Sequence, residues 1–115
     1  MISCIEQFSG FLLSSNRNIW LEDKKMAVYV RKSKRYLDNV LMNCVDIGSV
    51  NIEEKYRGKG TFSSFLKKIE KINPYKVIYI ENILNDNLAK HFKKIKWIEI
   101  KGIVSSFYKK MDYKK

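Results

Sequence analysis

The sequence predicts one α/β domain, with a mixed and mostly antiparallel sheet, a βαβ crossover and flanking helices. Its 115 residues can build one hydrophobic core, which places a single domain over residues 1–115. An apolar content of 45% with 13% aromatic residues is typical of a globular chain and not of a disordered one. A strand pattern, a helix pattern and a second strand pattern follow one another within residues 45–80, and this order predicts the crossover.

A short helix begins the predicted fold. Ile5, Phe8 and Leu12 recur at helical spacing within residues 1–13, so we expect their side chains to face the core. Residues 14–18 are a predicted loop.

Two strands are expected next. Residues 26–31 alternate in character and include β-branched and aromatic side chains, a pattern typical of a strand. We predict a basic turn over residues 31–35. A second strand over residues 40–45 is expected to pair antiparallel with the first.

The apolar pattern changes parity in the following strand. Val45 and Ile47 occupy odd positions, whereas Val50 and Ile52 occupy even ones, and Gly48 lies between the two pairs. A strand with one buried face needs an extra residue to change parity, so we predict a β-bulge there. Such a bulge would leave backbone groups free to pair with a linear, amide-bearing ligand. Alternatively, it is a bend in the sheet that binds nothing.

A turn, a helix and a central strand complete the crossover. The helix is expected to bury one apolar stripe, made of Phe62, Phe65, Leu66 and Ile69, and to expose a lysine-rich face. Asn73 and Pro74 predict its end. Residues 77–80 are all apolar, as expected of a strand buried on both faces.

The C-terminal part predicts a second helix and a closing hairpin. Asn85 is a suitable N-cap for the helix, whose expected buried stripe is Leu88, Phe92 and Ile95. Residues 97–100 and 104–111 flank a Lys-Gly turn and predict two antiparallel strands.

The turn before the first crossover helix is the most informative stretch of the chain. It reads Tyr56-Arg57-Gly58-Lys59-Gly60-Thr61-Phe62. A glycine-rich turn at a helix N-terminus exposes backbone N–H groups beside the positive end of the helix dipole, and Arg57 and Lys59 add charge. This arrangement predicts a phosphate-binding turn. The glycine spacing fits neither a P-loop nor a dinucleotide-binding turn.

The positive charge is concentrated in the same half of the chain. Residues 1–50 hold seven Lys and Arg against five Asp and Glu, a net charge of +2, and residues 51–115 hold sixteen against seven, a net charge of +9. Such a surface suits a polyanionic cofactor, an acidic partner or nucleic acid. Alternatively, the lysines form a solvated face without a partner.

Other features exclude several classes of protein. No stretch approaches the ~18 apolar residues that a membrane span needs, and residues 2–13 lack the basic leader of a signal peptide. Cys4 and Cys44 are far apart in sequence, which favours inert thiols in a reducing cytoplasm over a metal or redox role. With one His and no cysteine pair, no zinc site is expected.

Two segments together resemble the GNAT-fold N-acetyltransferases. The glycine turn resembles their Arg/Gln-x-x-Gly-x-Gly/Ala loop, which grips the pyrophosphate of acetyl-CoA. Residues 85–97 resemble their second signature, Asn-x-x-Ala-x-x-x-Tyr-x-Lys-x-Gly-Phe, with Asn85, Lys94 and Trp97 on the expected positions. The resemblance covers residues 45–111 and is greatest to small phage or bacterial members.

The resemblance implies an acetyl-CoA-dependent N-acetyltransferase with a GNAT-like fold, in which an acceptor amine attacks the thioester directly. The implied pyrophosphate-binding residues are Arg57, Gly58, Lys59, Gly60, Thr61 and Phe62. The backbone of Val50, Asn51 and Ile52 would pair with the pantetheine amides, and Asn85 would contact the same arm. Phe62 departs from the pattern, because Gly or Ala is usual there.

The catalytic side chains are less closely specified. Glu81, at the end of the central strand, is the first candidate for the general base, and Asp46 beside the bulge is the second. Alternatively, Glu81 forms a salt bridge at a loop edge and Asp46 is a sheet-edge charge. Phe92 replaces the tyrosine that often protonates the leaving thiolate, so Tyr108 is a candidate donor, unless it only packs in a strand. His91, on the lysine-rich helix, is expected to be exposed; alternatively, it takes part in catalysis.

The acceptor is open between a protein lysine or N-terminus, a polyamine-like small molecule and aminoacyl-tRNA. A non-catalytic basic module that binds nucleic acid or an acidic protein is the alternative function. The missing tyrosine supports it, whereas aromatic residues at core spacings, not interleaved with basic ones, argue against it. We expect a cytoplasmic monomer or homodimer, in the host cytoplasm if the gene is phage-encoded.

Overall fold

The computed structural model describes residues 2–81, 86–102 and 105–111 of the chain. Along these residues the elements are α1 (Cys4–Leu13), β1 (Asn18–Glu22), β2 (Met26–Leu37), β3 (Val40–Ile52), the 3-10 turn η1 (Glu54–Tyr56), α2 (Thr61–Ile72), β4 (Val77–Ile80), α3 (Asp86–Lys94), β5 (Ile98–Ile100) and β6 (Ser106–Lys110).

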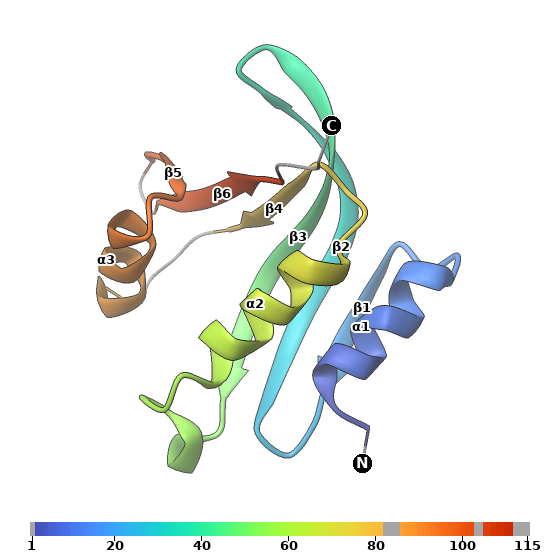
Figure 1. The fold of residues 1–115 in the computed structure, drawn as a ribbon, viewed down its shortest axis with the longest axis vertical. Coiled ribbons are helices and arrows are strands. Elements are labelled where there is room, and N and C mark those ends of the chain that lie inside the picture. Colours follow the sequence, from blue (N-terminus) through green and yellow to red (C-terminus); the bar gives the residue numbers. More distant parts are fainter. Residues whose placement is uncertain (1, 82–85, 103–104, 112–115) are drawn as a thin grey trace.

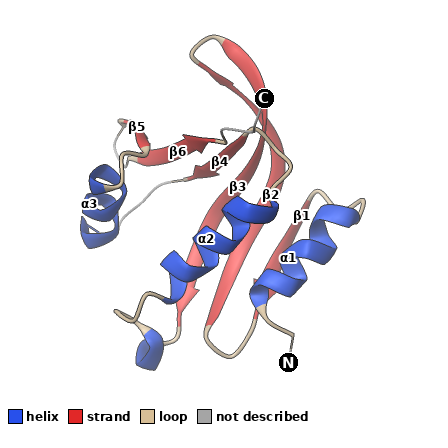
Figure 2. Cartoon of the chain, viewed as in Figure 1, coloured by secondary structure: helices blue, strands red, loops and turns tan. Residues whose placement is uncertain are grey.

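The described strands form one six-stranded sheet in the order β1-β2-β3-β4-β6-β5 (Figures 1 and 2). Neighbouring strands are antiparallel except β3 and β4, which are parallel and joined by α2. The predicted fold class, a mixed and mostly antiparallel sheet with a βαβ crossover and flanking helices, is therefore confirmed. The predicted closing hairpin is also confirmed, as β5 and β6.

α1, α2 and α3 cover one face of this sheet. Phe8 of α1, Phe65 of α2 and Phe92 of α3 belong to the same buried cluster, together with strand residues such as Val45. A smaller cluster lies on the opposite face and consists of Leu37, Cys44, Val77, Tyr79 and Tyr108. Adjacent residues of one strand fall into different clusters because successive side chains point to opposite faces. We call the face with the smaller cluster the outer face.

The predicted N-terminal helix is confirmed as α1. Its N-cap, Ser3, accepts a hydrogen bond from the Glu6 N–H, and the Glu6 carboxylate accepts one from the Ser3 N–H in return. This capping box satisfies two N–H groups that the helix itself leaves unpaired. Of the helices that the structure describes, none has the length and apolar character needed to cross a membrane.

The predicted crossover helix and central strand are also confirmed. The apolar stripe of α2 is buried, and the helix ends at Ile72, just before Asn73 and Pro74. All four residues of β4 are buried.

The predicted basic turn over residues 31–35 is wrong. β2 continues through these residues, and the chain reverses at Asp38 and Asn39, whose φ angles of 54° and 65° fit a two-residue hairpin turn. The strand can continue through these charged residues because Arg31 and Arg35 point to the outer face, where both donate hydrogen bonds to the buried carboxylate of Asp46. β1 was not predicted, since Leu21 is the one buried residue among its five.

The predicted bulge in β3 is confirmed. Tyr29 of β2 pairs with Ser49, whereas Val30 pairs with Ile47, so Gly48 is the extra residue. A Cβ atom on Gly48 would lie 3.2 Å from Tyr29 Cδ2 and 3.3 Å from Glu81 Oε1. Glycine is therefore favoured at this position because neighbouring side chains approach its backbone closely.

The stripe predicted for the second helix is partly wrong. Phe92 is fully buried and packs on Trp97, with ring centroids 4.8 Å apart. Ile95, however, is 45% exposed because α3 ends at Lys94, before it. The third member, Leu88, and the predicted N-cap, Asn85, lie outside the residues whose side chains are described.

A buried carboxylate joins β2, β3 and β4 on the outer face. Asp46 of β3 is 1% exposed and accepts hydrogen bonds from Ser33 Oγ at 2.8 Å, from Arg35 Nε and Nη2 at 3.1 and 2.8 Å, and from Arg31 Nη2 at 3.3 Å. Both arginines also contact the Glu81 carboxylate at the end of β4. We call Arg31, Arg35, Asp46 and Glu81 the arginine–carboxylate cluster.

Removing the charge of Asp46 is expected to destabilise the fold strongly. Asp46→Asn should lower the free energy of unfolding by about 3 kcal/mol, because two partly buried guanidinium groups lose a partner. Asp38→Asn is the matched control, since Asp38 is 65% exposed and pairs with Lys110 at 2.9 Å. Its effect should stay below about 1 kcal/mol. Urea denaturation measures both, and equal losses would contradict a structural role for the buried carboxylate.

The buried thiols are expected to make stability depend on alkaline pH. Burial, with added repulsion from Asp23 and Asp46 respectively, raises the pKa of Cys4 to about 12 and that of Cys44 to about 11. Unfolded thiols ionise near 9.0, so above this pH the unfolded state loses protons that the folded state keeps. The free energy of unfolding should therefore fall as the pH rises from 9.0 towards about 11. Urea denaturation should show a shallower fall for a Cys4→Ala, Cys44→Ala double variant, and an identical slope would contradict this account.

Candidate functional site

The parallel pairing of β3 and β4 stops at the bulge. The two strands pair from Cys44 and Val77 to Ile47 and Ile80, and the Glu81 N–H donates to the Ile47 carbonyl oxygen at 3.1 Å. Beyond this point β3 continues to Ile52 with β2 as its partner among the described strands (Figure 1). The β4-side edge of β3 is therefore unpaired with β4 over residues 48–52, as the sequence predicted.

The glycine turn connects this free edge to α2. Gly58 and Gly60 have φ angles of 72° and 76°, in the left-handed region that favours glycine. Gly60 is the N-cap of α2 and provides no side-chain cap, so the first N–H groups of the helix are left for another acceptor. The positive end of the helix dipole lies at the same place. The turn thus combines the two features of an anion-binding helix N-terminus.

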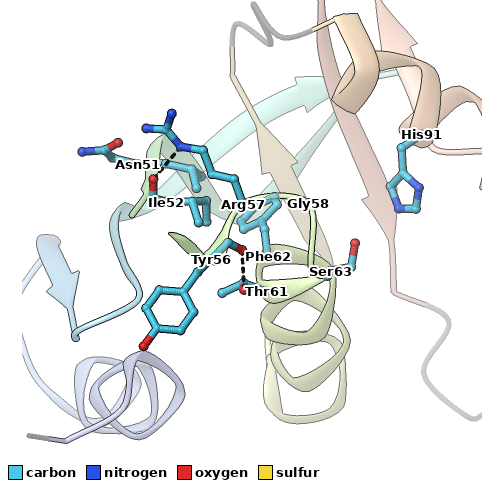
Figure 3. A pocket seen from close by; sticks show the side chains of 11 residues that line it. Asn51, Ile52, Tyr56, Arg57, Gly58, Thr61, Phe62, Ser63 and His91 are labelled. Atoms are coloured by element: carbon cyan, nitrogen blue, oxygen red, sulfur yellow. Dashed lines mark hydrogen bonds between the residues drawn. The ribbon is translucent and has the colours of Figure 1, made fainter. Parts of the chain in front are cut away.

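Two side chains of the turn hold its shape. Arg57 Nε donates to the Ile52 carbonyl oxygen at 2.8 Å, and Thr61 Oγ1 donates to the Tyr56 carbonyl oxygen at 3.2 Å (Figure 3). Both bonds are internal to the segment that leads from β3 into α2. They fix the backbone of the turn, in which the N–H groups of Tyr56 and Arg57 also donate to the carbonyl oxygens of Glu53 and Glu54.

A pocket of about 570 Å³ joins the free edge of β3 to the turn (Figure 3). Its size is that of a small-molecule or cofactor site. It is lined by Val50, Asn51, Ile52, Tyr56, Arg57, Gly58, Gly60, Thr61, Phe62, Ser63 and His91. The structure therefore brings together all the predicted cofactor-binding residues except two: Lys59 is in the turn but does not line the pocket, and Asn85 lies outside the described residues.

The structure shows how Phe62 fits at a position where the GNAT loop usually has Gly or Ala. Its side chain is 8% exposed and belongs to the buried cluster under the helices, with its ring 6.3 Å from that of Phe65. The ring therefore contributes to the core while its backbone N–H belongs to the first turn of α2. A bulky residue at this position leaves the turn accessible.

The sequence analysis did not assign Tyr56 and Ser63, which lie next to predicted lining residues, and it also missed His91, which comes from a separate helix. His91 was expected to be exposed on the lysine-rich helix, but it is half-buried and lines the pocket from α3 (Figure 3). Its spacing along α3 contains no signal of this role, because the position of α3 beside the pocket depends on residues far away in the chain.

Glu81 lies beside the bulge but outside the pocket lining. Its side chain is 25% exposed, and Arg31 and Arg35 both contact its carboxylate, the latter at 3.5 Å. The contacts of Glu81 thus match the alternative in which it forms a salt bridge, and its partners are two arginines. The carboxylate also approaches Gly48, so it is close to the place where β3 and β4 separate.

The other two candidate catalytic residues are enclosed. Both oxygens of Asp46 accept hydrogen bonds from arginine side chains, and the residue is 1% exposed, so an acceptor amine has little access to this carboxylate. Tyr108 is 3% exposed and stacks on Tyr79, with ring centroids 6.3 Å apart. Burial, with repulsion from Asp38, raises the pKa of its hydroxyl. Neither residue lines the pocket, and both roles stay predictions.

Comparison with known proteins identifies the fold. No protein-family model matches the sequence, and no curated protein sequence matches it either. Among solved structures, a Tyr-to-Phe mutant of the AtaT toxin, bound to the C-terminus of the antitoxin AtaR and acetyl-CoA, is similar with a TM-score of 0.61 at 13% sequence identity. The match covers 76% of this chain and 59% of the AtaT chain, so this chain spans well under two thirds of that toxin.

KacT is similar over more of its length. The KacTA–DNA complex has a TM-score of 0.59 at 12% identity, with 92% of this chain and 80% of that chain covered. A Tyr-to-Phe mutant of KacT has a TM-score of 0.58 at 12% identity, with 95% and 85% covered. These likenesses do not single out small phage or bacterial members. They show that this chain shares its fold with AtaT and KacT, in agreement with the GNAT-like fold class expected from the sequence.

Proposed function

We propose that this chain is an N-acetyltransferase that transfers the acetyl group of acetyl-CoA to an amine. The observation that carries the proposal is the pocket that joins the free edge of β3 to the glycine turn at the uncapped end of α2. A ligand with a diphosphate at one end and amide groups along its arm fits both parts. That AtaT, a protein of the same fold, is bound to acetyl-CoA supports this choice of ligand.

The backbone supplies most of the proposed cofactor contacts. N–H groups between Gly58 and Phe62 receive the diphosphate, assisted by the dipole of α2. Backbone groups of Val50, Asn51 and Ile52 pair with the pantetheine amides, as a further strand would. Asn85 is assigned to the same arm on the family resemblance alone. Lys59 contributes charge near the turn.

Catalysis is proposed to depend on positioning and proton transfer. The cofactor arm brings its thioester to the separation of β3 and β4, where a backbone N–H of the bulged strand polarises the carbonyl group. Glu81 receives the proton of the attacking amine, directly or through water. We rank it above Asp46 because the Glu81 side chain is 25% exposed and lies where β3 and β4 separate, whereas Asp46 is 1% exposed. Phe92 has no hydroxyl to protonate the thiolate, and Tyr108 is retained as a candidate donor.

The acceptor is proposed to be macromolecular. The region before β2 is short and leaves little material for a deep acceptor pocket, and the net charge of residues 51–115 suits an acidic protein or a nucleic-acid-linked amine. Protein amines, small polyamines and aminoacyl-tRNA are the classes to screen. Two buried, free thiols fit a reducing cytoplasm, the compartment we propose.

One observation favours the second candidate, a binding module without catalysis. On the outer face the Trp20 and Tyr29 rings are 5.3 Å apart, the Arg31 guanidinium lies 5.7 Å from the Tyr29 ring, and that of Arg35 lies 3.8 Å from Tyr79. Aromatic and cationic side chains are therefore interleaved, as base-stacking surfaces require. Steeply salt-dependent RNA or DNA binding without any effect of CoA would favour this candidate.

Acetyl-CoA is expected to stabilise the wild-type chain and not Gly60→Glu. At a concentration near a hundredfold Kd, a ligand adds about 2.7 kcal/mol, or several °C in Tm for a small domain. Gly60→Glu places a carboxylate in the anion-binding turn and should abolish the shift, measured by differential scanning fluorimetry. Gly60→Gln is the matched control, because it introduces the same strain at φ 76° without the charge. An equal shift in wild type and Gly60→Glu would exclude this turn as the phosphate site.

Glu81→Gln is expected to lower turnover while leaving cofactor affinity nearly unchanged. Loss of a general base typically costs about a hundredfold or more in rate. Steady-state kinetics with an amine identified by mass-spectrometric screening gives kcat, and calorimetry gives the Kd for acetyl-CoA. Glu22→Gln, an exposed carboxylate on β1, is the control. Wild-type turnover in Glu81→Gln would remove this residue from the mechanism.

A further inference from the structure

α3 contributes one side chain to the proposed cofactor pocket. All other lining residues belong to β3, to the glycine turn or to the first turn of α2, and His91 faces them from α3 (Figure 3). The pocket is thus bounded on two sides by different helices. What the imidazole does there does not follow from the GNAT signature, in which this position is variable.

The core fixes where His91 lies. The neighbouring Phe92 is fully buried and packs on Phe107, with ring centroids 5.5 Å apart, and on Trp97. The imidazole ring lies edge-to-face with the Phe92 ring, with ring centroids 5.9 Å apart. It makes no side-chain hydrogen bond to the described part of the chain, so its N–H is available to a ligand.

The set of lining residues indicates which part of the cofactor His91 faces. The pocket that it lines includes Gly58, Gly60 and Ser63, at the diphosphate end of the proposed site. Ile80 and Glu81, at the acyl end, are not part of that lining. Because Val50 and Asn51 also line the pocket, His91 faces the part of the site that runs from the pantetheine arm to the diphosphate, and not the thioester.

The turn itself leaves a role for such a donor. Arg57 Nε is bonded to the Ile52 carbonyl oxygen, the Thr61 hydroxyl is bonded to the Tyr56 carbonyl oxygen, and Lys59 does not line the pocket. Apart from the Nη groups of Arg57, the turn thus offers mainly backbone N–H groups, all from one side of the pocket. A diphosphate has acceptor oxygens that point in several directions, and those that face α3 need a donor of their own.

We propose that His91 donates an imidazole N–H to the cofactor's phosphate oxygens, from the side opposite the glycine turn. This inference rests on the proposed function, because it assigns a contact within the proposed acetyl-CoA site. It adds a side-chain ligand to a site otherwise built from backbone. Through His91, α3 would bind the cofactor directly, whereas its neighbour Phe92 is buried in the core.

Calorimetric titration with CoA tests the proposal. His91→Ala should weaken binding about tenfold or more, as expected for a lost hydrogen bond to a charged group. His91→Gln keeps an N–H donor and should recover most of the affinity, whereas His91→Phe fills the space without a donor and should bind as weakly as His91→Ala. Lys90→Ala, an exposed neighbour on α3, is the matched control and should bind like wild type.

A second titration with pantetheine, which has no phosphate, separates a phosphate contact from a packing contact. His91→Ala should bind pantetheine as the wild-type chain does. Wild-type CoA affinity in His91→Phe, or an equal loss of CoA and pantetheine binding in His91→Ala, would overturn the assignment while leaving the cofactor site in place. Failure of the wild-type chain to bind CoA would instead overturn the proposed function, and this inference with it.

Discussion

One extra residue in β3, Gly48, marks the point where β3 stops pairing with β4 and its edge becomes free. A strand buried on one face cannot exchange its inward side chains for outward ones without a bulge, and Gly48 provides it. Over residues 44–47, just before Gly48, β3 is an inner strand with β2 and β4 as partners. Downstream, its β4-side edge is unpaired with that strand and leads into the turn before α2. The free edge, the glycine turn and the pocket between them all follow this single change in register along the chain.

The arginine–carboxylate cluster maintains that geometry on the outer face. Its two cations and two anions balance, so the cluster neutralises its own charge where the sheet is not covered by a helix. The attraction must offset the cost of removing these groups from water, which is why Asp46 has several donors and not one. Because Arg31 and Arg35 also contact Glu81, they hold the proposed general base beside Gly48.

The proposed cofactor site consists largely of backbone groups, and this explains how the fold is recognisable at 12–13% identity. A left-handed turn and an uncapped helix end need glycine at two positions and tolerate almost any residue elsewhere. Phe62 illustrates the tolerance, since its ring enters the core while its N–H stays in the turn. Side-chain chemistry is then free to vary, as at Phe92, where a hydroxyl is absent, and at His91, where an imidazole enters the pocket.

The sequence alone determined the features that depend on local pattern. The parity change placed the bulge, the two glycines placed the turn, and apolar spacing placed α2 and β4, because each of these is a statement about neighbouring residues. Tertiary structure decided the rest. Residues 31–35 look like a turn until Asp46, Arg31 and Arg35 are seen to neutralise one another across two strands. The place of His91 in the pocket depends on how α3 packs through Phe92 against β6. Such contacts join residues that are distant in the chain, and no local periodicity records them.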